Sequence, residues 1–213
     1  MLEIETRQIA YNRAKRSETI KYIVIHDTGN KAKGSDAEAH FKYFNGGNRK
    51  SSADFFVDSK RVLQANDYDK YYTYHVGDGK GKYGITNQNS VGIEICVNED
   101  GDYDKAFENA VELTKHLMQV LNIPIERVVR HYDASRKNCP ASMSEDNWCR
   151  WKLFKEAVNM SCVKELTEVN DIVWELSHRG IITDTELWLK KLEDDNNSYW
   201  LARKCLQHIR GLE

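Results

Sequence analysis

This chain of 213 residues lacks an excess of one charge, a long apolar run, an internal repeat and any low-complexity tract. Its 31 basic and 33 acidic residues give a formal net charge of -2, so nothing draws it generally toward nucleic acid or an anionic membrane. No stretch approaches the roughly 18 successive apolar residues that a membrane-spanning helix needs. We therefore expect no nucleic-acid partner and no membrane partner.

A secretory leader and a disulfide framework are also missing. The first residues show no basic segment followed by a long apolar segment, so they do not form a recognisable signal peptide. The cysteines are odd in number and widely separated, and no CxxC pair occurs among Cys96, Cys139, Cys149, Cys162 and Cys205. This usage is typical of reduced thiols, and we expect a protein that is made in the cytoplasm.

The patterns that are present mix strands with helices, which predicts an α/β domain over residues 1–159. Residues 22–29, YIVIHDTG, are apolar and β-branched and end at a glycine, which predicts a buried strand. Residues 91–98, VGIEICVN, alternate strictly and carry Glu94 on the face opposite the apolar row. The fold class that these patterns favour is a central mixed β-sheet flanked by helices.

Other segments fill this domain. A strand, a polar turn and a second strand are predicted over residues 51–66, and a further short strand over 126–133. Ser144 is the expected N-cap of the last of three predicted helices, which cover residues 36–44, 104–123 and 144–158. The most amphipathic of them, 104–123, directs five positions toward the core: Ala106, Ala110, Leu113, Leu117 and Val120 or Leu121.

The last part of the chain, residues 160–213, shows helix patterns without a strand signal. Three helices are predicted at residues 167–180, 183–194 and 198–211, the second opened by the capping box Thr183-x-x-Glu186. They form a small all-helical C-terminal module. Three of the five tryptophans lie here, and we expect most of them to build its core, although tryptophan can also stack on sugars: Trp174, Trp188 and Trp200.

Two histidines and a cysteine form a candidate metal site. His26 and His131 each end a predicted strand, and Cys139 follows His131 in a loop. Strand ends in an α/β sheet commonly carry functional sites. Two imidazoles and one thiolate would leave a zinc ion one open position for water, which is the arrangement of catalytic zinc. The residue types also allow a Cys139–His131 nucleophile pair, or histidines that are merely satisfied polar residues.

Three motifs in this order resemble a known enzyme family: YIVIHDTG, SVGIEICVN and RHYDASRKNCP. Together they are similar to the zinc-dependent N-acetylmuramoyl-L-alanine amidases of the phage endolysin and bacterial autolysin type, whose fold the peptidoglycan recognition proteins share. The resemblance covers about residues 15–158. It implies zinc as the cofactor, with His26, His131 and Cys139 as its ligands.

The resemblance also implies that Glu94 is the catalytic acid and base and that Lys137 stabilises the oxyanion. The residues agree with these roles, because a carboxylate buried in a strand has a raised pKa that suits proton transfer. A cation two residues before Cys139 would favour a negatively charged intermediate. The alternatives are a strand carboxylate paired with a neighbouring cation and a solvated loop lysine.

Other histidines and one departure complete the comparison with the family. His75, in YYTYHVGDG, matches a loop histidine that lines the substrate cleft, so we expect it to contact substrate rather than metal. His40 and His116 lie on predicted helices and are expected to be surface or packing residues. Asp54 stands where family members often carry histidine or tyrosine, so any catalytic role of that position is vacant or altered here.

The implied function is hydrolysis of the amide bond between N-acetylmuramic acid and L-alanine in bacterial peptidoglycan. A phage endolysin or a prophage-derived autolysin, acting on the wall after release from the cytoplasm, fits this picture. The C-terminal module would then bind the wall or form a homo-oligomer. Two alternatives stay open: a non-catalytic peptidoglycan receptor of the same fold, which would typically lack Cys139, and a zinc peptidase that cuts within the stem peptide.

Overall fold

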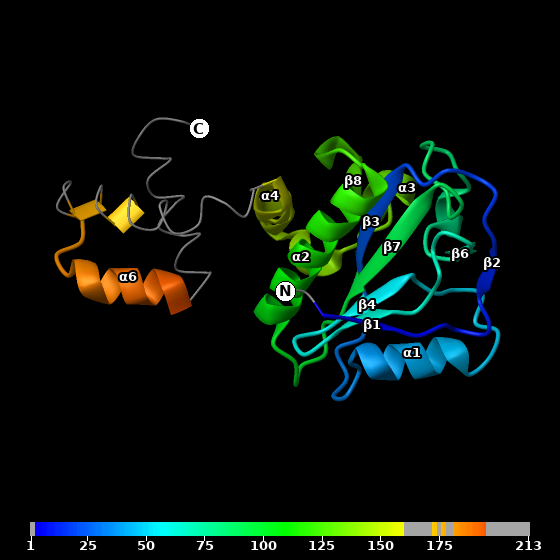
Figure 1. The fold of residues 1–213 in the computed structure, drawn as a ribbon, viewed down its shortest axis with the longest axis horizontal. Coiled ribbons are helices and arrows are strands. Elements are labelled where there is room, and N and C mark those ends of the chain that lie inside the picture. The colour runs from blue at the N-terminus through cyan, green and yellow to red at the C-terminus, as the bar shows by residue number, and fades with distance from the viewer. Residues whose placement is uncertain (1–2, 160–171, 174–175, 178–180, 195–213) are drawn as a thin grey trace. The chain divides into compact units, whose positions relative to one another are not determined.

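A six-stranded mixed sheet lies at the centre of residues 3–159, with the strand order β1-β5-β4-β7-β3-β8 (Figure 1). Within this part of the chain, β4 and β5 pair antiparallel, and the other neighbouring strands of the sheet pair parallel. Its strands are β1 (Ile4–Thr6), β3 (Tyr22–Asp27), β4 (Phe55–Val57), β5 (Val62–Gln64), β7 (Ser90–Ile95) and β8 (Val128–Arg130). A separate antiparallel pair joins β2 (Arg13–Lys15) to β6 (Tyr71–Thr73).

The computed structural model describes residues 3–159, 172–173, 176–177 and 181–194. The chain divides into two compact units, Met1–Asn159 and Met160–Glu213. The helices are α1 (Ala37–Asn45), α2 (Tyr103–Leu121), α3 (His131–Ser135), α4 (Glu145–Asn159) and α6 (Thr185–Asp194), with 3-10 turns η1 (Gly77–Gly79), η2 (Ile125–Arg127) and η3 (Ala141–Met143). No helix among the described residues is long and apolar enough to cross a membrane.

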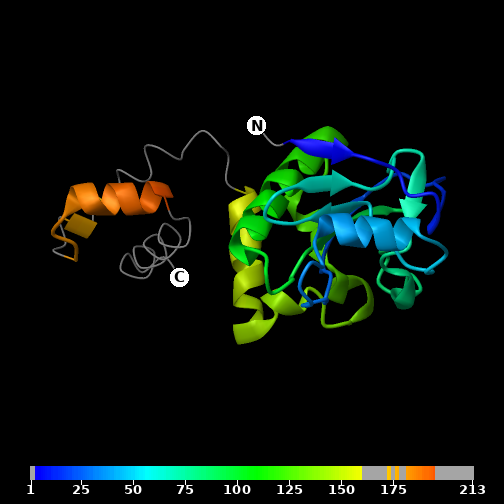
Figure 2. The same cartoon turned by 90° about the horizontal axis from the view of Figure 1, so that it is seen from below.

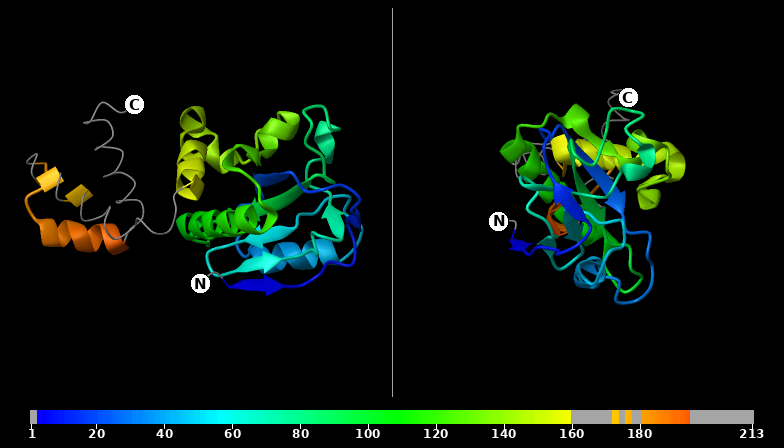
Figure 3. Two further views of the ribbon diagram at one scale, coloured as in Figure 1. Left: turned by 45° about the horizontal axis from the view of Figure 1, so that its top comes forward. Right: turned by 90° about the vertical axis from the view of Figure 1, so that its right-hand side faces the viewer.

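The central strands β3 and β7 are buried on both faces, which explains their apolar sequences. One face of the sheet is covered by α1, which packs on β4 and β5 and contributes Ala37 and Phe41 to a core with Phe56 and Leu63 (Figure 2). The opposite face is covered by α2, and α4 packs on α2 (Figure 3). The predicted α/β architecture is therefore confirmed.

Most predicted elements are present, with some corrections. The strands β1, β2 and β6 were not predicted, because their three residues are mostly polar or half-buried and form no apolar run like those of β4 and β8. In α2, Val120 is 58% exposed, so the core position left open in the sequence belongs to the half-buried Leu121. At the end of α2, Asn122 adopts a left-handed conformation and terminates the helix at Leu121.

The segment after β8 differs from the prediction in two places. His131 does not end a strand; it is the first residue of α3, because the Asp133 carboxylate accepts a hydrogen bond from the Arg130 backbone N–H at 2.9 Å and caps the helix start. Ser144 is not an N-cap, since its hydroxyl donates to the Ala141 carbonyl at 2.9 Å. Positive φ angles at residues 146–148 interrupt α4, where the Trp148 ring packs 4.2 Å from the Arg130 guanidinium.

The unit Met160–Glu213 is described in part. Its buried residues form a small apolar cluster against which Trp188 and Leu189 pack: Ile172, Val173, Leu176, Ile182 and Leu192. Trp188 is thus a packing residue, as predicted. The helix α6 is capped by Asp184, whose carboxylate accepts from Leu187 N at 2.9 Å, and not by Thr183. Trp174, Trp200 and the predicted helix 198–211 lie outside the described residues, and the role of this unit stays a prediction.

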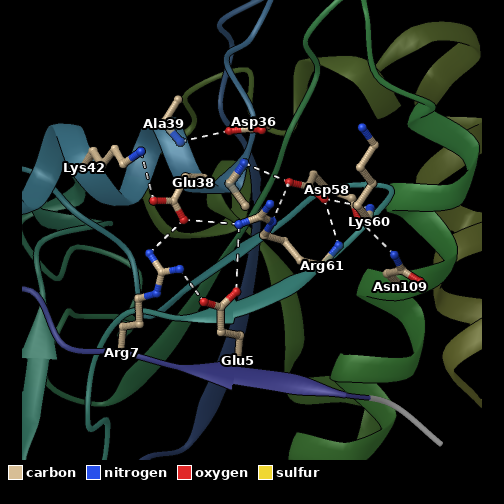
Figure 4. A network of polar contacts seen from close by, with 11 residues as sticks. Glu5, Arg7, Asp36, Glu38, Ala39, Lys42, Asp58, Lys60, Arg61 and Asn109 are labelled. Carbon is tan, nitrogen blue, oxygen red and sulfur yellow. Dashed lines mark hydrogen bonds and ion pairs between the residues drawn. The ribbon is translucent and has the colours of Figure 1, made fainter.

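A buried carboxylate, Asp58, fixes the start of α1 to the β4–β5 turn (Figure 4). Its Oδ2 accepts from Ala37 N at 3.0 Å, and its Oδ1 accepts from Lys60 N at 2.7 Å and Arg61 N at 2.8 Å. Its backbone carbonyl accepts from the Asn109 side chain on α2 at 2.9 Å. One residue therefore joins a turn of the sheet to helices on both of its faces.

We expect Asp58→Ala to lower the free energy of unfolding by about 3 kcal/mol, because three backbone N–H groups lose a charged, buried acceptor. Urea unfolding of the full chain followed by circular dichroism measures this change. Glu112→Ala is the matched control, since Glu112 is 52% exposed in its ion pair with Lys115 and its removal should change stability by less than about 0.5 kcal/mol. Equal effects of the two substitutions would contradict the role given to Asp58.

Candidate metal centre

The parallel register of the sheet brings the candidate residues together. β3 pairs with β7 so that His26 lies opposite Glu94, and β3 pairs with β8 so that Ile25 lies opposite Arg130. Directly opposed residues of parallel strands point to the same face, so the side chains of His26 and Glu94 are neighbours. The next residue after Arg130 is His131, which the same register sets beside His26. Their Nδ1 atoms are 3.1 Å apart.

The short helix α3 and the loop after it bring Cys139 back toward His26 and His131. Arg136 ends α3 in a left-handed conformation with φ 70°, and Tyr132 N donates to the Cys139 carbonyl at 3.0 Å. The chain then continues into η3, where Ser142 N donates to the Asp27 carboxylate at the end of β3 at 2.7 Å. These hydrogen bonds on either side of the cysteine hold its Sγ 3.8 Å from His26 Nδ1.

The geometry of this cluster fits a metal ion. One donor atom from each of the buried residues His26, His131 and Cys139 lies within 4.8 Å of the other two. Tetrahedral zinc bonds of about 2.05 Å to nitrogen and 2.3 Å to sulfur would place two nitrogens about 3.3 Å apart and nitrogen and sulfur about 3.6 Å apart. The observed separations of 3.1 Å and 3.8 Å are close to these values.

Hydrogen bonds on the far side of each imidazole decide which ring nitrogen faces the centre. His131 Nε2 lies 2.8 Å from an Asp78 carboxylate oxygen, whose other oxygen accepts from Ser135 Oγ at 3.1 Å. A carboxylate can only accept, so Nε2 of His131 carries the proton and its Nδ1 presents a lone pair. Carboxylates commonly orient metal-bound histidines in this way.

A chain of hydrogen bonds through Ser90 and His75 determines which ring nitrogen of His26 carries the proton. Ser90 Oγ donates to the Thr86 carbonyl, so it accepts from His75 Nε2 at 3.2 Å. His75 Nδ1 is then unprotonated and accepts from His26 Nε2 at 3.1 Å. His26 Nδ1 therefore presents a lone pair to the same centre as His131 Nδ1. The two Nδ1 atoms are 3.1 Å apart and neither carries a proton, so they cannot form a hydrogen bond and their lone pairs repel each other. A cation bound between them would remove this repulsion.

Two glycines make room for the residues that support the histidines. A Cβ on Gly92 would lie 2.7 Å from the His75 ring, so only glycine at this position of β7 lets the ring lie on the sheet beside His26. A Cβ on Gly79 would lie 2.2 Å from the Ala134 carbonyl oxygen, so glycine also lets η1 approach α3 and deliver Asp78. The sequence marks both places, with a glycine inside an apolar strand and the turn Gly-Asp-Gly.

Glu94 stands next to the cluster, with Oε1 4.0 Å from His26 Nδ1. Burial, with a smaller contribution from the nearby Asp27, raises the pKa of Glu94 to about 8, and the positive charge of Lys137 opposes this shift. The direction agrees with the prediction from the sequence. A carboxyl group with a pKa near neutrality can accept and return a proton, which is what an acid and base catalyst must do.

Burial also keeps the imidazoles neutral. It lowers the pKa of His26 well below its usual value and the pKa of His75 to about 3, and it lowers the pKa of His131 against the partly compensating Asp78 carboxylate. Neutral imidazoles are the form that binds metal. Burial raises the pKa of the Cys139 thiol, and a bound cation would reverse that shift.

The remaining predicted residues occupy different positions. Lys137 is exposed on the loop after α3, and its charge influences the pKa values of the cluster. His75 is 7% exposed and lies against His26, so its expected contact with substrate stays a prediction. His116 is on the surface, as expected. The sequence did not identify Asp78 or Ser90, because neither position fits a ligand pattern before the fold is known.

The open question of Asp54 has a structural answer. Its side chain is fully buried, and its carboxylate accepts from Gly92 N at 2.8 Å, Asn66 Nδ2 at 2.8 Å and Thr73 Oγ1 at 3.0 Å. These contacts tie β4 to β7 and β6. Asp54 therefore supports the sheet beneath the candidate centre.

Comparison with known proteins identifies the family. Residues 16–142 match the family Amidase_2, described as N-acetylmuramoyl-L-alanine amidase. The chain belongs to this amidase family. The matched residues include Glu94 and the three candidate ligands, so the cluster described above lies within the part of the chain that defines the family.

Two curated relatives of this chain belong to Bacillus subtilis (strain 168). It is 40% identical over 140 residues to the N-acetylmuramoyl-L-alanine amidase CwlH of Bacillus subtilis (strain 168), a match that covers 66% of this chain and 53% of CwlH. Its identity to XlyA of the same organism is 40% over 143 residues, covering 67% of this chain and 46% of XlyA. The chain thus spans about half the length of the curated relatives it matches.

Solved structures of amidase relatives share the fold. The catalytic domain of XlyA superposes with a TM-score of 0.66 at 37% identity, covering 74% of this chain and 99% of that domain. PlyL gives a TM-score of 0.66 at 32% identity, covering 76% of this chain and 100% of PlyL. These likenesses confirm the mixed sheet flanked by helices.

We expect the metal-free chain to carry the ring proton of His26 on Nε2, because the relay through His75 and Ser90 ends at a backbone carbonyl that can only accept. Nitrogen chemical shifts of the labelled histidine rings in solution NMR distinguish the two tautomers. Ser90→Ala removes the acceptor that holds His75 and should allow both tautomers of His26. A proton on Nδ1 of His26 in the unaltered chain would show that the relay runs in the other direction.

Proposed function

We propose that this chain hydrolyses the amide bond between N-acetylmuramic acid and L-alanine of bacterial peptidoglycan, with zinc bound by His26, His131 and Cys139. The observation that carries the proposal is the meeting of these three donor atoms with the Glu94 carboxylate in a chain of the amidase family. The imidazoles of His26 and His131 and the thiolate of Cys139 would hold zinc and leave it a position for water. When bound there, zinc supplies a Lewis acid that polarises the scissile carbonyl and activates water.

The residues of the chain supply the proton transfers. Glu94 takes a proton from the attacking water and returns it to the nitrogen of the leaving L-alanine. Burial raises the pKa of Glu94 and so favours the protonated form that returns the proton, whereas the positive charge of Lys137, and of zinc when bound, would favour the carboxylate that accepts it. Lys137 contributes a positive charge that acts on Glu94 and would favour the oxyanion that forms when the carbonyl is attacked.

Two other functions on the same fold are less well supported. A non-catalytic peptidoglycan receptor does not need a thiol ligand, whereas Cys139 is buried within the donor cluster of this chain. A zinc peptidase acting within the stem peptide would use the same cluster, but the family match favours the amide next to the sugar. A phage endolysin and a bacterial autolysin are both consistent with the proposed reaction.

We expect removal of metal to abolish hydrolysis of purified peptidoglycan and added zinc to restore it. Cys139→Ser should lower the rate by at least about 100-fold, because it replaces a zinc ligand. Cys149→Ser is the matched control and should keep full activity, since Cys149 is an exposed free thiol away from the cluster. Turbidity of a wall suspension measures the rate.

Mass spectrometry of the products separates the candidate functions. The proposed amidase releases peptides with a new L-alanine amino terminus, a stem-peptide peptidase creates a different terminus, and a receptor creates none. Undiminished lysis by the chelated chain or by Cys139→Ser would overturn the zinc mechanism.

We expect Asp78→Ala to weaken zinc binding by about 10- to 100-fold, because His131 loses the carboxylate that holds its ring and tautomer. Competition with a chromophoric chelator measures the affinity without using catalysis. Glu112→Ala also removes an exposed carboxylate, but one on α2 that is not part of the cluster, and it should leave the affinity for zinc unchanged. If both variants bind zinc as tightly as the unaltered chain, Asp78 has no role in orienting His131.

A further inference from the structure

A cavity of about 400 Å³ adjoins Glu94 on the side of the sheet that α1 covers. Thr28, just beyond the end of β3, lines it, as do His40 and Phe44 of α1 and Phe56 of β4. Its volume is within the range of small-molecule sites. Glu94 thus borders both the candidate metal centre and this cavity. A ligand in the cavity would therefore lie next to the amide bond that the proposed reaction cleaves.

Three polar atoms around this cavity have no partner. Among the described residues, five buried side-chain polar atoms lack a hydrogen bond, and three of them belong to lining residues: Thr28 Oγ1, His40 Nε2 and Glu94 Oε2. Burying polar groups without partners is unfavourable, and such groups usually mark the position of a ligand or water. Their convergence on one cavity indicates a site for a molecule that offers several hydrogen bonds.

The rest of the wall is aromatic. The His40 ring stacks on Phe56 at 5.8 Å between centroids with an interplanar angle of 13°, and it also stacks on Phe44 at 6.5 Å. Tyr43, which is 52% exposed, stands at the rim. Flat aromatic surfaces beside hydrogen-bonding atoms suit a ligand that has an apolar face and polar edges, as a pyranose ring has.

Charge narrows the choice of ligand. Among the residues that the structure describes, no lysine or arginine lines the cavity, and burial lowers the pKa of His40, so its ring is neutral at neutral pH. The described lining residues therefore offer no cation to pair with a carboxylate on the side of α1, away from the candidate metal centre, and burying an unpaired carboxylate there would be unfavourable. The muramoyl side of the scissile amide carries an uncharged acetamido group and hydroxyls, whereas stem peptides carry free carboxylates beyond L-alanine.

We propose that the cavity walled by α1 is the subsite for the N-acetylated sugar on the muramoyl side of the scissile amide, with His40 and Thr28 as its hydrogen-bonding residues. This assignment rests on the proposed amidase function. It gives His40, expected from the sequence to be a surface or packing residue, a role in binding substrate.

Two soluble substrates test the subsite with the full, zinc-loaded chain. One is N-acetylmuramoyl-L-alanyl-D-isoglutamine, and the other is the same dipeptide carrying only a lactyl group in place of the sugar. His40→Asn loses the polar atom at the Nε2 position, whereas His40→Gln keeps one there. We expect His40→Asn to raise KM for the muramoyl substrate about fivefold and to leave KM for the lactyl substrate unchanged, with partial rescue by His40→Gln.

Two further variants complete the design. Thr28→Val should act like His40→Asn, and His116→Ala, a histidine removed from the exposed surface of α2, should change neither substrate. Equal losses on both substrates would overturn the sugar assignment and indicate a peptide subsite or a general defect. Unchanged KM values in His40→Asn and Thr28→Val would overturn it as well.

A binding measurement separates failure of the subsite from failure of the proposed function. If the unaltered chain cleaves neither substrate, saturation-transfer NMR with methyl N-acetyl-β-glucosaminide still decides the subsite. Saturation of the acetyl protons by the unaltered chain, reduced severalfold in His40→Asn but not in His116→Ala, would support the sugar assignment. The same saturation in all three proteins, or none, would overturn it.

Discussion

The site depends on the parallel pairing of β3 with its two neighbours. That pairing sets His26 opposite Glu94 on one side and leads the chain from β8 directly into His131 on the other. No flexible loop has to carry a histidine into position, because backbone hydrogen bonds of a buried sheet fix the distance between the strands. His131 directly follows β8 as the first residue of α3, whereas Cys139 neither lies in a strand nor directly follows one. The helix α3 and the Asp27 carboxylate restrain the segment that carries this cysteine.

The sequence was sufficient for the core elements and for the donor cluster, and the reasons are physical. β3 and β7 are long, apolar and bounded by turn residues, and α2 repeats its apolar positions over nineteen residues, so their patterns are unambiguous. The short strands β1, β2 and β6 carry no such period. The start of α3 and the break in α4 are set by contacts of Asp133 and Trp148, which no local pattern contains.

The supporting residues of the site were hidden from the sequence for a different reason. Asp78 and Ser90 act through the ring nitrogens of His131 and His75, and a pattern of residue types does not reveal which nitrogen a partner will contact. The tautomers follow only when each hydrogen bond is traced to a group that can only accept. Asp78 and Ser90, which look incidental in the sequence, thus determine that the Nδ1 lone pairs of His131 and His26 face each other.

The joint at Asp58 has a consequence for selectivity. The helix α1 carries the aromatic and polar wall of the cavity beside Glu94, yet it is anchored at its first turn by a carboxylate of the β4–β5 turn, far along the chain from His40. Because Asp58 holds the first turn of α1, a change in the length or conformation of the β4–β5 turn would shift α1 relative to the sheet and so widen or narrow the cavity. Changing that turn would therefore alter which ligands the cavity of this chain accepts, while the pairing of β3 with β7 keeps His26 beside Glu94.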